Sequence, residues 1–192
     1  MKAVLLNGAL DGDGSVLSVH AILAEELARA GWQLRPFILR EWAIRPCTGC
    51  FGCWVQTPGV CVMDDAAKEI VQAVIQSRLT IFLTPVTFGG YSSELKKGLD
   101  RLIPLVSPFF ERINGEVHHR MRYPRYPSLL GVGVSPHPDD ESTRLFTTLL
   151  ERNAINFHAP SRGAGVVAAD WPTDRVRNEI RSLLAKVGVA GK

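Results

Sequence analysis

The sequence predicts a doubly wound α/β fold, in which helices cover both faces of a five-stranded parallel sheet. Three observations predict it. Short apolar runs alternate along the chain with segments of helical periodicity, which is the order of βα units. The apolar runs are continuous, as in parallel strands that are buried on both faces. Polar loops rich in Gly, Ser and Pro follow several runs, at the ends where open α/β sheets bind ligands.

Length and charge limit the classes of function. A chain of 192 residues predicts one domain over residues 1–192, with enough residues for a full hydrophobic core. The net charge of +3 gives no electrostatic case for nucleic acid as a partner. No apolar run is long enough to span a bilayer, and the first run is too short for an export signal. We therefore expect a cytoplasmic protein, without a membrane partner, whose cysteines are reduced.

The first βα unit lies at the N-terminus. Residues 2–6 form an apolar run that predicts a strand, and a turn rich in Gly and Asp follows it. A helix then begins, with Ser15 or Asp13 as its N-cap, and Gly31 ends it. Residues 32–39 predict a second strand. The turn therefore joins a buried strand to a helix N-terminus, where backbone amides and the helix dipole can hold a phosphate.

The pattern of this turn is a weak signal for phosphate binding. Gly12-x-Gly14 begins a dinucleotide fingerprint, but Leu17 stands at the third glycine position. The lysine of a Walker A loop is absent from the sequence of the turn. Asp11 and Asp13 would repel a phosphate unless they point away from it. A plain turn without a ligand therefore remains an alternative.

All four cysteines of the chain are clustered at positions 47, 50, 53 and 61. A Cys-x2-Cys-x2-Cys run can place three thiolates around one corner of a cubane cluster, with a fourth supplied from nearby. Structural zinc sites usually have two cysteine pairs separated by a longer spacer, so zinc fits less well. Two interpretations stay open: a [4Fe-4S] cluster on Cys47, Cys50, Cys53 and Cys61, and a compact metal-free loop.

Helices flank the third strand, which residues 79–83 predict. Asp64 and Asp65 are suited to cap the helix before the strand rather than to act as an acid/base pair. Ser92 or the serine after it begins the helix that follows the strand. The polar face of that second helix carries Lys96, Lys97, Asp100 and Arg101, and we expect an ion pair between residues four positions apart.

The loop at residues 84–93 follows the third strand. It combines hydroxyl groups, backbone amides, an apolar edge and two aromatic rings. Its place at the carboxyl end of a strand is where open α/β sheets bind ligands. This mixture suits a planar heteroaromatic ring, which needs hydrogen bonds at one edge and packing on its face.

The second half of the chain predicts two more βα units. Residues 109–127 are long for a connection and mix basic with aromatic side chains, so we expect an active-site wall or a subunit contact. Residues 129–134 predict the fourth strand, and a helix follows near residues 140–152. Residues 154–158 predict the fifth strand, and residues 173–187 predict the last helix.

Three motifs lie within roughly the first 105 residues and are fairly specific. They are Pro46-Cys47-x-Gly49-Cys50-x-x-Cys53-Trp54, Thr57-Pro58-Gly59-x-Cys61-x-x-x-Asp65, and Thr84-Pro85-Val86-x-Phe88-Gly89-x-Tyr91-Ser92-x-x-Leu95-Lys96 with Asp100-Arg101. The chain resembles the flavodoxin-fold family of NAD(P)H-dependent FMN reductases, in the branch related to iron–sulfur flavoproteins and multimeric flavodoxins. The resemblance implies a flavodoxin-like sheet with strand order 2-1-3-4-5 and a homodimer or homotetramer.

The resemblance also implies where FMN binds. The loop after the first strand would cradle the phosphate, the loop after the third would line the isoalloxazine, and the loop after the fourth would contact its edge. The implied FMN-binding residues are Gly8, Leu10, Gly12, Gly14, Ser15, Val16, Pro85, Val86, Thr87, Phe88, Gly89, Tyr91, Ser135 and His137. No side chain is expected to be catalytic, because the flavin itself carries the chemistry.

The implied function is that of an oxidoreductase. It would pass electrons from NAD(P)H through FMN to a small acceptor such as a quinone, a flavin or an aromatic compound. Two alternatives are an electron carrier with a [4Fe-4S] cluster and a non-catalytic binding module with a degenerate FMN site. The binding module is considered because the phosphate loop differs from that of the family. The family usually has Gly-Ser-x-Arg in this loop, whereas this chain has Gly8-Ala9-Leu10-Asp11. Each charge-assisted hydrogen bond to a phosphate contributes about 1.5–3 kcal/mol, so the missing arginine leaves weaker FMN binding open.

Overall fold

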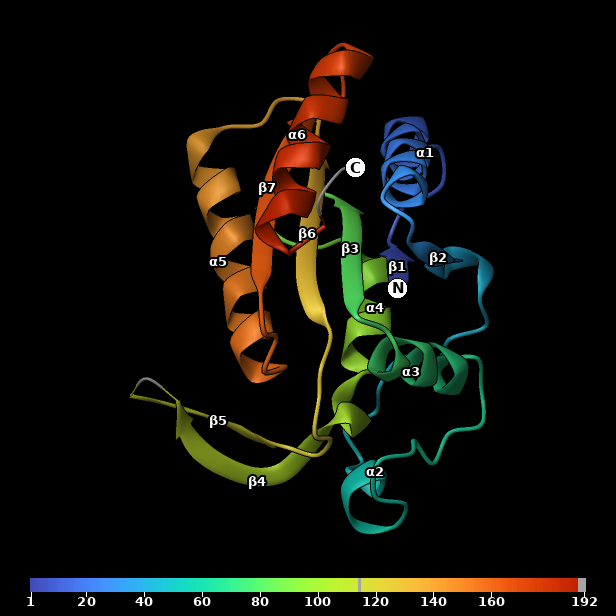
Figure 1. Ribbon diagram of the computed structural model, residues 1–192. Coiled ribbons are helices and arrows are strands. Elements are labelled where there is room, and N and C mark those ends of the chain that lie inside the picture. The colour runs from blue at the N-terminus through green and yellow to red at the C-terminus, as the bar shows by residue number, and fades with distance from the viewer. Residues whose placement is uncertain (114, 190–192) are drawn as a thin grey trace.

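One parallel sheet organises the molecule (Figure 1). The structure is a computed structural model that describes residues 1–113 and 115–189. Five parallel strands are hydrogen-bonded in the order β2-β1-β3-β6-β7, which confirms the predicted order 2-1-3-4-5 of the parallel strands. The strands are β1 (Lys2–Asn7), β2 (Gln33–Ile38), β3 (Leu79–Pro85), β6 (Ser128–Ser135) and β7 (Arg162–Ala168).

Helices cover both faces of this sheet (Figure 1). Helices α1 (Gly14–Arg29) and α6 (Thr173–Lys186) pack on one face, and α3 (Ala67–Gln76), α4 (Ser93–Asp100) and α5 (Asp140–Asn156) pack on the other. Each face of the sheet has its own hydrophobic core. Leu5 of β1 is buried in the core under α1 and α6, and the adjacent Leu6 is buried in the core on the other face. Burial on both faces explains why the apolar runs are continuous.

The cysteine stretch (residues 45–65) and a hairpin formed by β4 (Val106–Ile113) and β5 (Glu116–Met121) lie outside the layers. The short helix α2 (Gly52–Val55) lies with the hairpin below the sheet in Figure 1, near the ends at which β3 and β6 begin. The 3-10 turns η1 (Leu39–Glu41) and η2 (Ile103–Leu105) complete the described elements. Of the helices in the described residues, none is both long and apolar enough to cross a membrane.

The long connection predicted at residues 109–127 is largely an antiparallel hairpin. Strands β4 (Val106–Ile113) and β5 (Glu116–Met121) pair with each other and not with the main sheet. The prediction missed them because the hairpin is separated from the core: most residues of β5 are exposed, so the strand lacks a clear alternation of apolar and polar residues.

The prediction of a fifth strand at residues 154–158 is wrong. Helix α5 continues through Asn156 instead. Phe146, Leu150 and Ala154 are all buried and follow one another at intervals of four residues, so the apolar residues there extend the buried stripe of the helix.

The fifth strand of the sheet is β7. Its sequence contains two glycines and therefore only weakly predicts a strand. A Cβ atom at Gly165 would lie 3.0 Å from a methyl group of Leu183, and one at Gly163 would lie 3.2 Å from Cβ of Lys186. Helix α6 therefore approaches this strand closely, and the glycines that weaken the strand pattern permit that approach.

Candidate functional site

The loops after β1, β3 and β6 meet at one edge of the sheet. The three strands are direct neighbours, with Asn7 beside Leu83 and Pro85 beside Val134 in the register. Each loop begins where its strand ends, so the predicted FMN-binding residues lie on three adjacent loops at the carboxyl edge. This is the edge at which open α/β sheets bind ligands.

The β1–α1 loop (residues 8–13) starts with a close packing contact at Gly8. The Gly8 amide donates to the Leu83 carbonyl at 2.8 Å, and the hydroxyl of Ser92 donates to the Gly8 carbonyl at 2.6 Å. A Cβ atom at Gly8 would lie 2.5 Å from Cβ of Leu95. Gly8 therefore fixes the loop against β3 and α4.

Two acidic side chains of this loop behave differently. The carboxylate of Asp13 accepts a hydrogen bond from the Leu10 amide at 2.7 Å, so it stays within the loop. The side chain of Asp11 is fully exposed to solvent. Asp11 is therefore free to turn into solvent, whereas the charge of Asp13 stays close to the start of α1.

The first turn of α1 offers free donors. The amides of Ser15 and Val16 have no hydrogen-bond partner among the described residues, as expected for the start of a helix. A Cβ atom placed at Gly12 or Gly14 would meet nothing within 4 Å, so the space above this turn is open. The first turn also carries no acidic residue. Such a helix start is suited to binding a phosphate.

One cation, Arg40 of η1, lies beside the β1–α1 loop. Its Nη1 donates to the carbonyl oxygens of Ala9 at 3.3 Å and Leu10 at 3.4 Å, and its Nε lies 3.5 Å from Oδ1 of Asp11. Sequence reasoning missed Arg40 because it follows a different strand, 31 positions after Ala9.

The β3–α4 loop contains a tight turn between Thr87 and Gly90. Each of these two residues donates its amide to the carbonyl of the other, at 3.1 and 2.8 Å. Phe88 and Gly89 at the centre both have positive φ, 49° and 73°, and Phe88 is fully exposed. A Cβ atom at Gly89 would lie 3.0 Å from the side chain of Leu145. The turn is thus tightly constrained and presents an aromatic ring to solvent.

Two other predicted ring contacts in this loop face the protein. The Val86 amide donates to the Val134 carbonyl at 2.8 Å, which leaves no amide there for a ligand. The Tyr91 hydroxyl accepts a hydrogen bond from Nδ2 of Asn153 at 3.0 Å. Burial raises the pKa of Tyr91 to about 12, so the hydroxyl stays protonated. Ser135, the last residue of β6, is half-buried, and His137 in the loop that follows β6 is exposed.

A cavity of about 620 Å³ lies between α4 and the second half of α5, and its lining extends from Tyr91 in the β3–α4 loop to the cysteine stretch. Tyr91, Leu149 and Asn153 line one part of it, and Cys47 and Phe51 line another. Its volume falls within the range of about 300–1,000 Å³ that is typical of small-molecule sites. The cavity therefore connects two regions that the sequence singled out separately.

The four cysteines line one smaller pocket, of about 40 Å³, together with Arg101. Cys47 and Cys50 are exposed, Cys53 is buried and Cys61 is partly buried, and all four thiols are free. Burial, with the nearby sulfur atoms of the other cysteines, raises the pKa of Cys53. Among residues 1–113 and 115–189, no group of three or more His, Cys, Asp or Glu side chains is arranged to hold a metal ion. The predicted [4Fe-4S] ligand set is therefore not supported.

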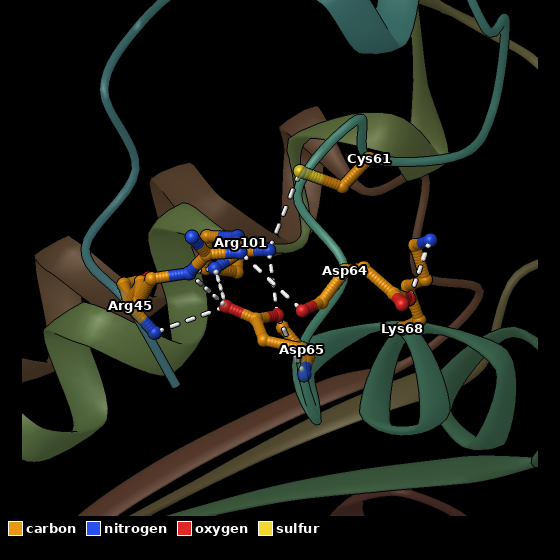
Figure 2. Close-up of polar contacts among 7 residues, drawn as sticks. Arg45, Cys61, Asp64, Asp65, Lys68 and Arg101 are labelled. Carbon is orange, nitrogen blue, oxygen red and sulfur yellow. Dashed lines mark hydrogen bonds and ion pairs between the residues drawn. The ribbon is translucent and has the colours of Figure 1, made fainter. Parts of the chain in front are cut away.

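Arg101 ties both ends of the cysteine stretch together (Figure 2). Its two terminal nitrogens form a paired contact with the carboxylate of Asp65, at 2.7 and 2.8 Å. One of them also donates to the Arg45 carbonyl at 2.6 Å, and the other donates to Sγ of Cys61 at 3.3 Å. The side chains of Arg101 and Asp65 are 1% and 7% exposed.

This buried ion pair corrects the prediction that Arg101 lies on the polar face of α4. On that face, the expected pair four positions apart forms between Lys96 and Asp100, at 2.6 Å. Burial by itself would raise the pKa of Asp65, but hydrogen bonds from Arg101 and from backbone amides lower it to about 2. The prediction that Asp64 or Asp65 caps α3 is wrong, because Ala66 is at the N-cap position and Asp65 accepts from the Ala67 amide, at 3.1 Å, from outside the helix.

The hairpin packs on the cysteine stretch through aromatic rings. Trp54 stacks on Phe51 with ring centroids 5.0 Å apart, and its Nε1 donates to the Val106 carbonyl at 3.1 Å. The ring of His119 lies 5.2 Å from that of Trp54, and its Nδ1 is 2.7 Å from the carbonyl oxygen of Ser107. The hairpin therefore supports the cysteine stretch and α2.

A family model described as NADPH-dependent FMN reductase matches residues 1–118. An iron-sulfur flavoprotein of Methanocaldococcus jannaschii is 29% identical over 143 residues, which cover 74% of this chain and 67% of the relative. An iron-sulfur flavoprotein of Archaeoglobus fulgidus is 28% identical over 104 residues, so the match spans only 46% of that relative's length and 54% of this chain.

Solved structures share the fold at low sequence identity. An NAD(P)H:quinone oxidoreductase from Methanothermobacter marburgensis has a TM-score of 0.66 at 13% identity, with 95% of this chain and 96% of that chain covered. An FMN-dependent NADH-azoreductase from Bacillus anthracis, in complex with FMN, has a TM-score of 0.65 at 13% identity, with 100% and 99% covered. Together with the strand order, these likenesses establish a flavodoxin-like fold.

Proposed function

The chain belongs to the family of NADPH-dependent FMN reductases, and from this premise we propose that it is an FMN-dependent oxidoreductase that reduces a small acceptor with NAD(P)H. One observation carries the proposal: three loops on adjacent strands bring free helix amides and a constrained aromatic turn to the same edge of the sheet. FMN would supply the two-electron chemistry when bound, and the protein would bind and orient it.

The residues at the edge fit an FMN molecule. The amides of Ser15 and Val16, with the hydroxyl of Ser15, are donors suited to the phosphate at the start of α1. The amides of Phe88 and Gly89 have no partner among the described residues and are suited to the polar edge of the isoalloxazine. Their positions on a rigid turn would hold the ring in a fixed orientation.

We assign the acceptor to the 620 Å³ cavity, which begins at Tyr91 beside the β3–α4 loop. Leu99, Leu149 and Phe157 give it apolar walls, and Asn153 supplies an amide. This lining suits a neutral planar acceptor such as a quinone or another aromatic compound, which needs packing on its faces and a few hydrogen bonds at its edge.

A spectrum of the purified protein, followed by turnover assays, tests this function. We expect a two-banded flavin absorption, FMN after acid release, and NADPH or NADH oxidation that depends on an added benzoquinone or azo dye. A protein that stays colourless after incubation with FMN would contradict the proposal and would favour a non-catalytic binding module.

A second candidate is an electron carrier with a [4Fe-4S] cluster. Its support is that all four cysteines line one pocket and that the two curated relatives described above are iron-sulfur flavoproteins. Because the described side chains are not arranged as a ligand set, it ranks second. Iron and acid-labile sulfide analysis of protein purified without air separates the two candidates, since only the carrier contains about four of each per chain.

We further propose a homodimer or homotetramer. Large apolar side chains are exposed on the hairpin, where Phe109 and Phe110 are 68% and 59% exposed. Apolar groups that gather on a surface commonly mark a protein interface. Light scattering after size exclusion should give twice or four times the chain mass of 21.1 kDa. A mass equal to that of one chain would contradict this proposal.

A further inference from the structure

We propose that Arg40 supplies the positive charge for the flavin phosphate that the β1–α1 loop itself lacks. The inference rests on the proposed function, because it concerns the phosphate of the same FMN site. It assigns a role in phosphate binding to a residue that lies outside the β1–α1 loop.

The position of Arg40 follows from the sheet. Strands β1 and β2 pair in parallel with Asn7 beside Ile38, so both strands end at the same level. Residues that follow β2 therefore lie beside the loop that follows β1. The guanidinium of Arg40 lies against this loop, with Nη1 3.3 and 3.4 Å from the carbonyl oxygens of Ala9 and Leu10.

The charges of the loop explain why a cation is needed. Asp11 and Asp13 are its only ionisable residues, and the carboxylate of Asp13 is held inside the loop by the Leu10 amide. Without a cation, two free amides at the start of α1 would have to stabilise the negative charge of the phosphate next to the negative charge of that carboxylate. A guanidinium a few ångströms away attracts the phosphate and offsets the repulsion from the acids.

Arg40 is also available for this role. Its acidic partners are Asp11, whose Oδ1 lies 3.5 Å from Nε, and Glu41, whose Oε1 lies 3.7 Å from Nη2. Both carboxylates are on exposed side chains, so both pairs are weak. The side chain of Arg40 is 24% exposed, so part of the guanidinium remains accessible. An arginine whose sole role was to pin the two loop carbonyls would affect the binding of all flavins equally, and this difference allows a test.

The test compares FMN with riboflavin, which lacks the phosphate. Apoprotein of the wild type and of the variants Arg40→Gln, Arg40→Lys and Asp11→Asn is titrated with each flavin, and binding is read from the quenching of flavin fluorescence. We expect Arg40→Gln to weaken FMN binding about tenfold or more and to leave riboflavin binding unchanged, because a charge-assisted hydrogen bond to phosphate is lost. Arg40→Lys should recover part of the loss, and Asp11→Asn should bind FMN at least as tightly as the wild type.

Three results would overturn the inference. They are an equal loss for FMN and riboflavin in Arg40→Gln, no loss for either flavin, and a wild type that binds both flavins equally well. In the first two cases the FMN site itself stands, because the wild type still binds FMN. A wild type that binds neither flavin refutes both the inference and the proposed function. Far-UV circular dichroism and thermal unfolding of each variant check that it is folded.

Discussion

Arg101 is the residue on which the cysteine stretch most depends. A buried guanidinium binds Asp65, a backbone carbonyl and a sulfur atom, and its Nε has no hydrogen-bond partner among the described residues. Removing one member of a buried ion pair leaves the other charge without a partner, which costs far more than removing an exposed pair. Substitution of Arg101 or Asp65 should therefore change stability more than substitution of an exposed charged residue.

Replacing Arg101 with methionine should lower the free energy of unfolding by about 3–5 kcal/mol, because Asp65 would remain buried and charged. Urea denaturation measures the change. Lys96→Ala is the matched control, since it removes an exposed pair on the same helix and should cost less than about 1 kcal/mol. A loss in Arg101→Met as small as that of the control would show that the pair is dispensable.

Asp65 should also make stability depend on pH. Its pKa is lowered from 3.8 to about 2 in the folded protein. Because the folded value is lower, its contribution is complete above the unfolded pKa and disappears as pH falls through the folded pKa. We expect the unfolding free energy to decrease from about pH 4 to pH 2, and to decrease less steeply in Asp65→Asn. Glu26, whose pKa is also about 2, keeps a part of the slope in both proteins, so equal slopes would contradict the assignment.

Gly89 has a conformation that valine cannot adopt without strain. Its φ is 73° and a Cβ atom would press on Leu145, so Gly89→Val should distort the turn and lose bound FMN. Gly31→Val is the control, because Gly31 has a φ of 76° at the end of α1, away from the β3–α4 loop. The flavin content of both purified variants is the measurement. A normal content in Gly89→Val would refute the placement of the ring.

Among the helices, α4 connects the β1–α1 and β3–α4 loops at its start. Ser92 is the N-cap of α4: its Oγ accepts from the Leu95 amide at 3.2 Å and donates to the Gly8 carbonyl at 2.6 Å. One hydroxyl therefore positions both the helix and the β1–α1 loop. The sequence anticipated this cap, whereas the bond to Gly8 depends on how β1 and β3 pair.

Ser92→Ala should lower the free energy of unfolding by about 1–2 kcal/mol, because the helix loses its cap and a buried carbonyl loses its donor. Ser93→Ala is the matched control: Ser93 is exposed and should tolerate alanine with a change within about 0.5 kcal/mol. Chemical denaturation of both variants measures the change in the free energy of unfolding. Equal effects would mean that the hydroxyl of Ser92 contributes nothing specific.

For the whole molecule, FMN binding should be linked to folding. The phosphate and ring loops come from different βα units, so they form one site only when the sheet is assembled. A ligand that binds only the folded state stabilises it by about 2.7 kcal/mol at 100 times its dissociation constant. Flavin-free protein should therefore unfold at a lower temperature and recover when FMN is added. An unfolding temperature that does not respond to FMN would contradict binding at this edge.

Local patterns predicted four of the five parallel strands, because a continuous apolar run such as residues 79–83 acts within a few residues. The sequence also placed the loops after β1, β3 and β6 at one edge, since parallel strands bring their carboxyl ends together. It failed where an apolar segment fitted two elements, as in residues 154–158.

Contacts between side chains that are distant in the sequence depend on how the elements pack. Arg101 is buried because Asp65 and the Arg45 carbonyl reach it from the cysteine stretch, and no periodicity in α4 encodes those partners. Arg40 lies beside the β1–α1 loop because β2 pairs with β1. Interactions between near neighbours thus determined most of the main sheet and the edge at which the loops after β1, β3 and β6 meet. The charges at that edge and the closure of the cysteine stretch were decided by contacts that exist only after the strands and helices have packed.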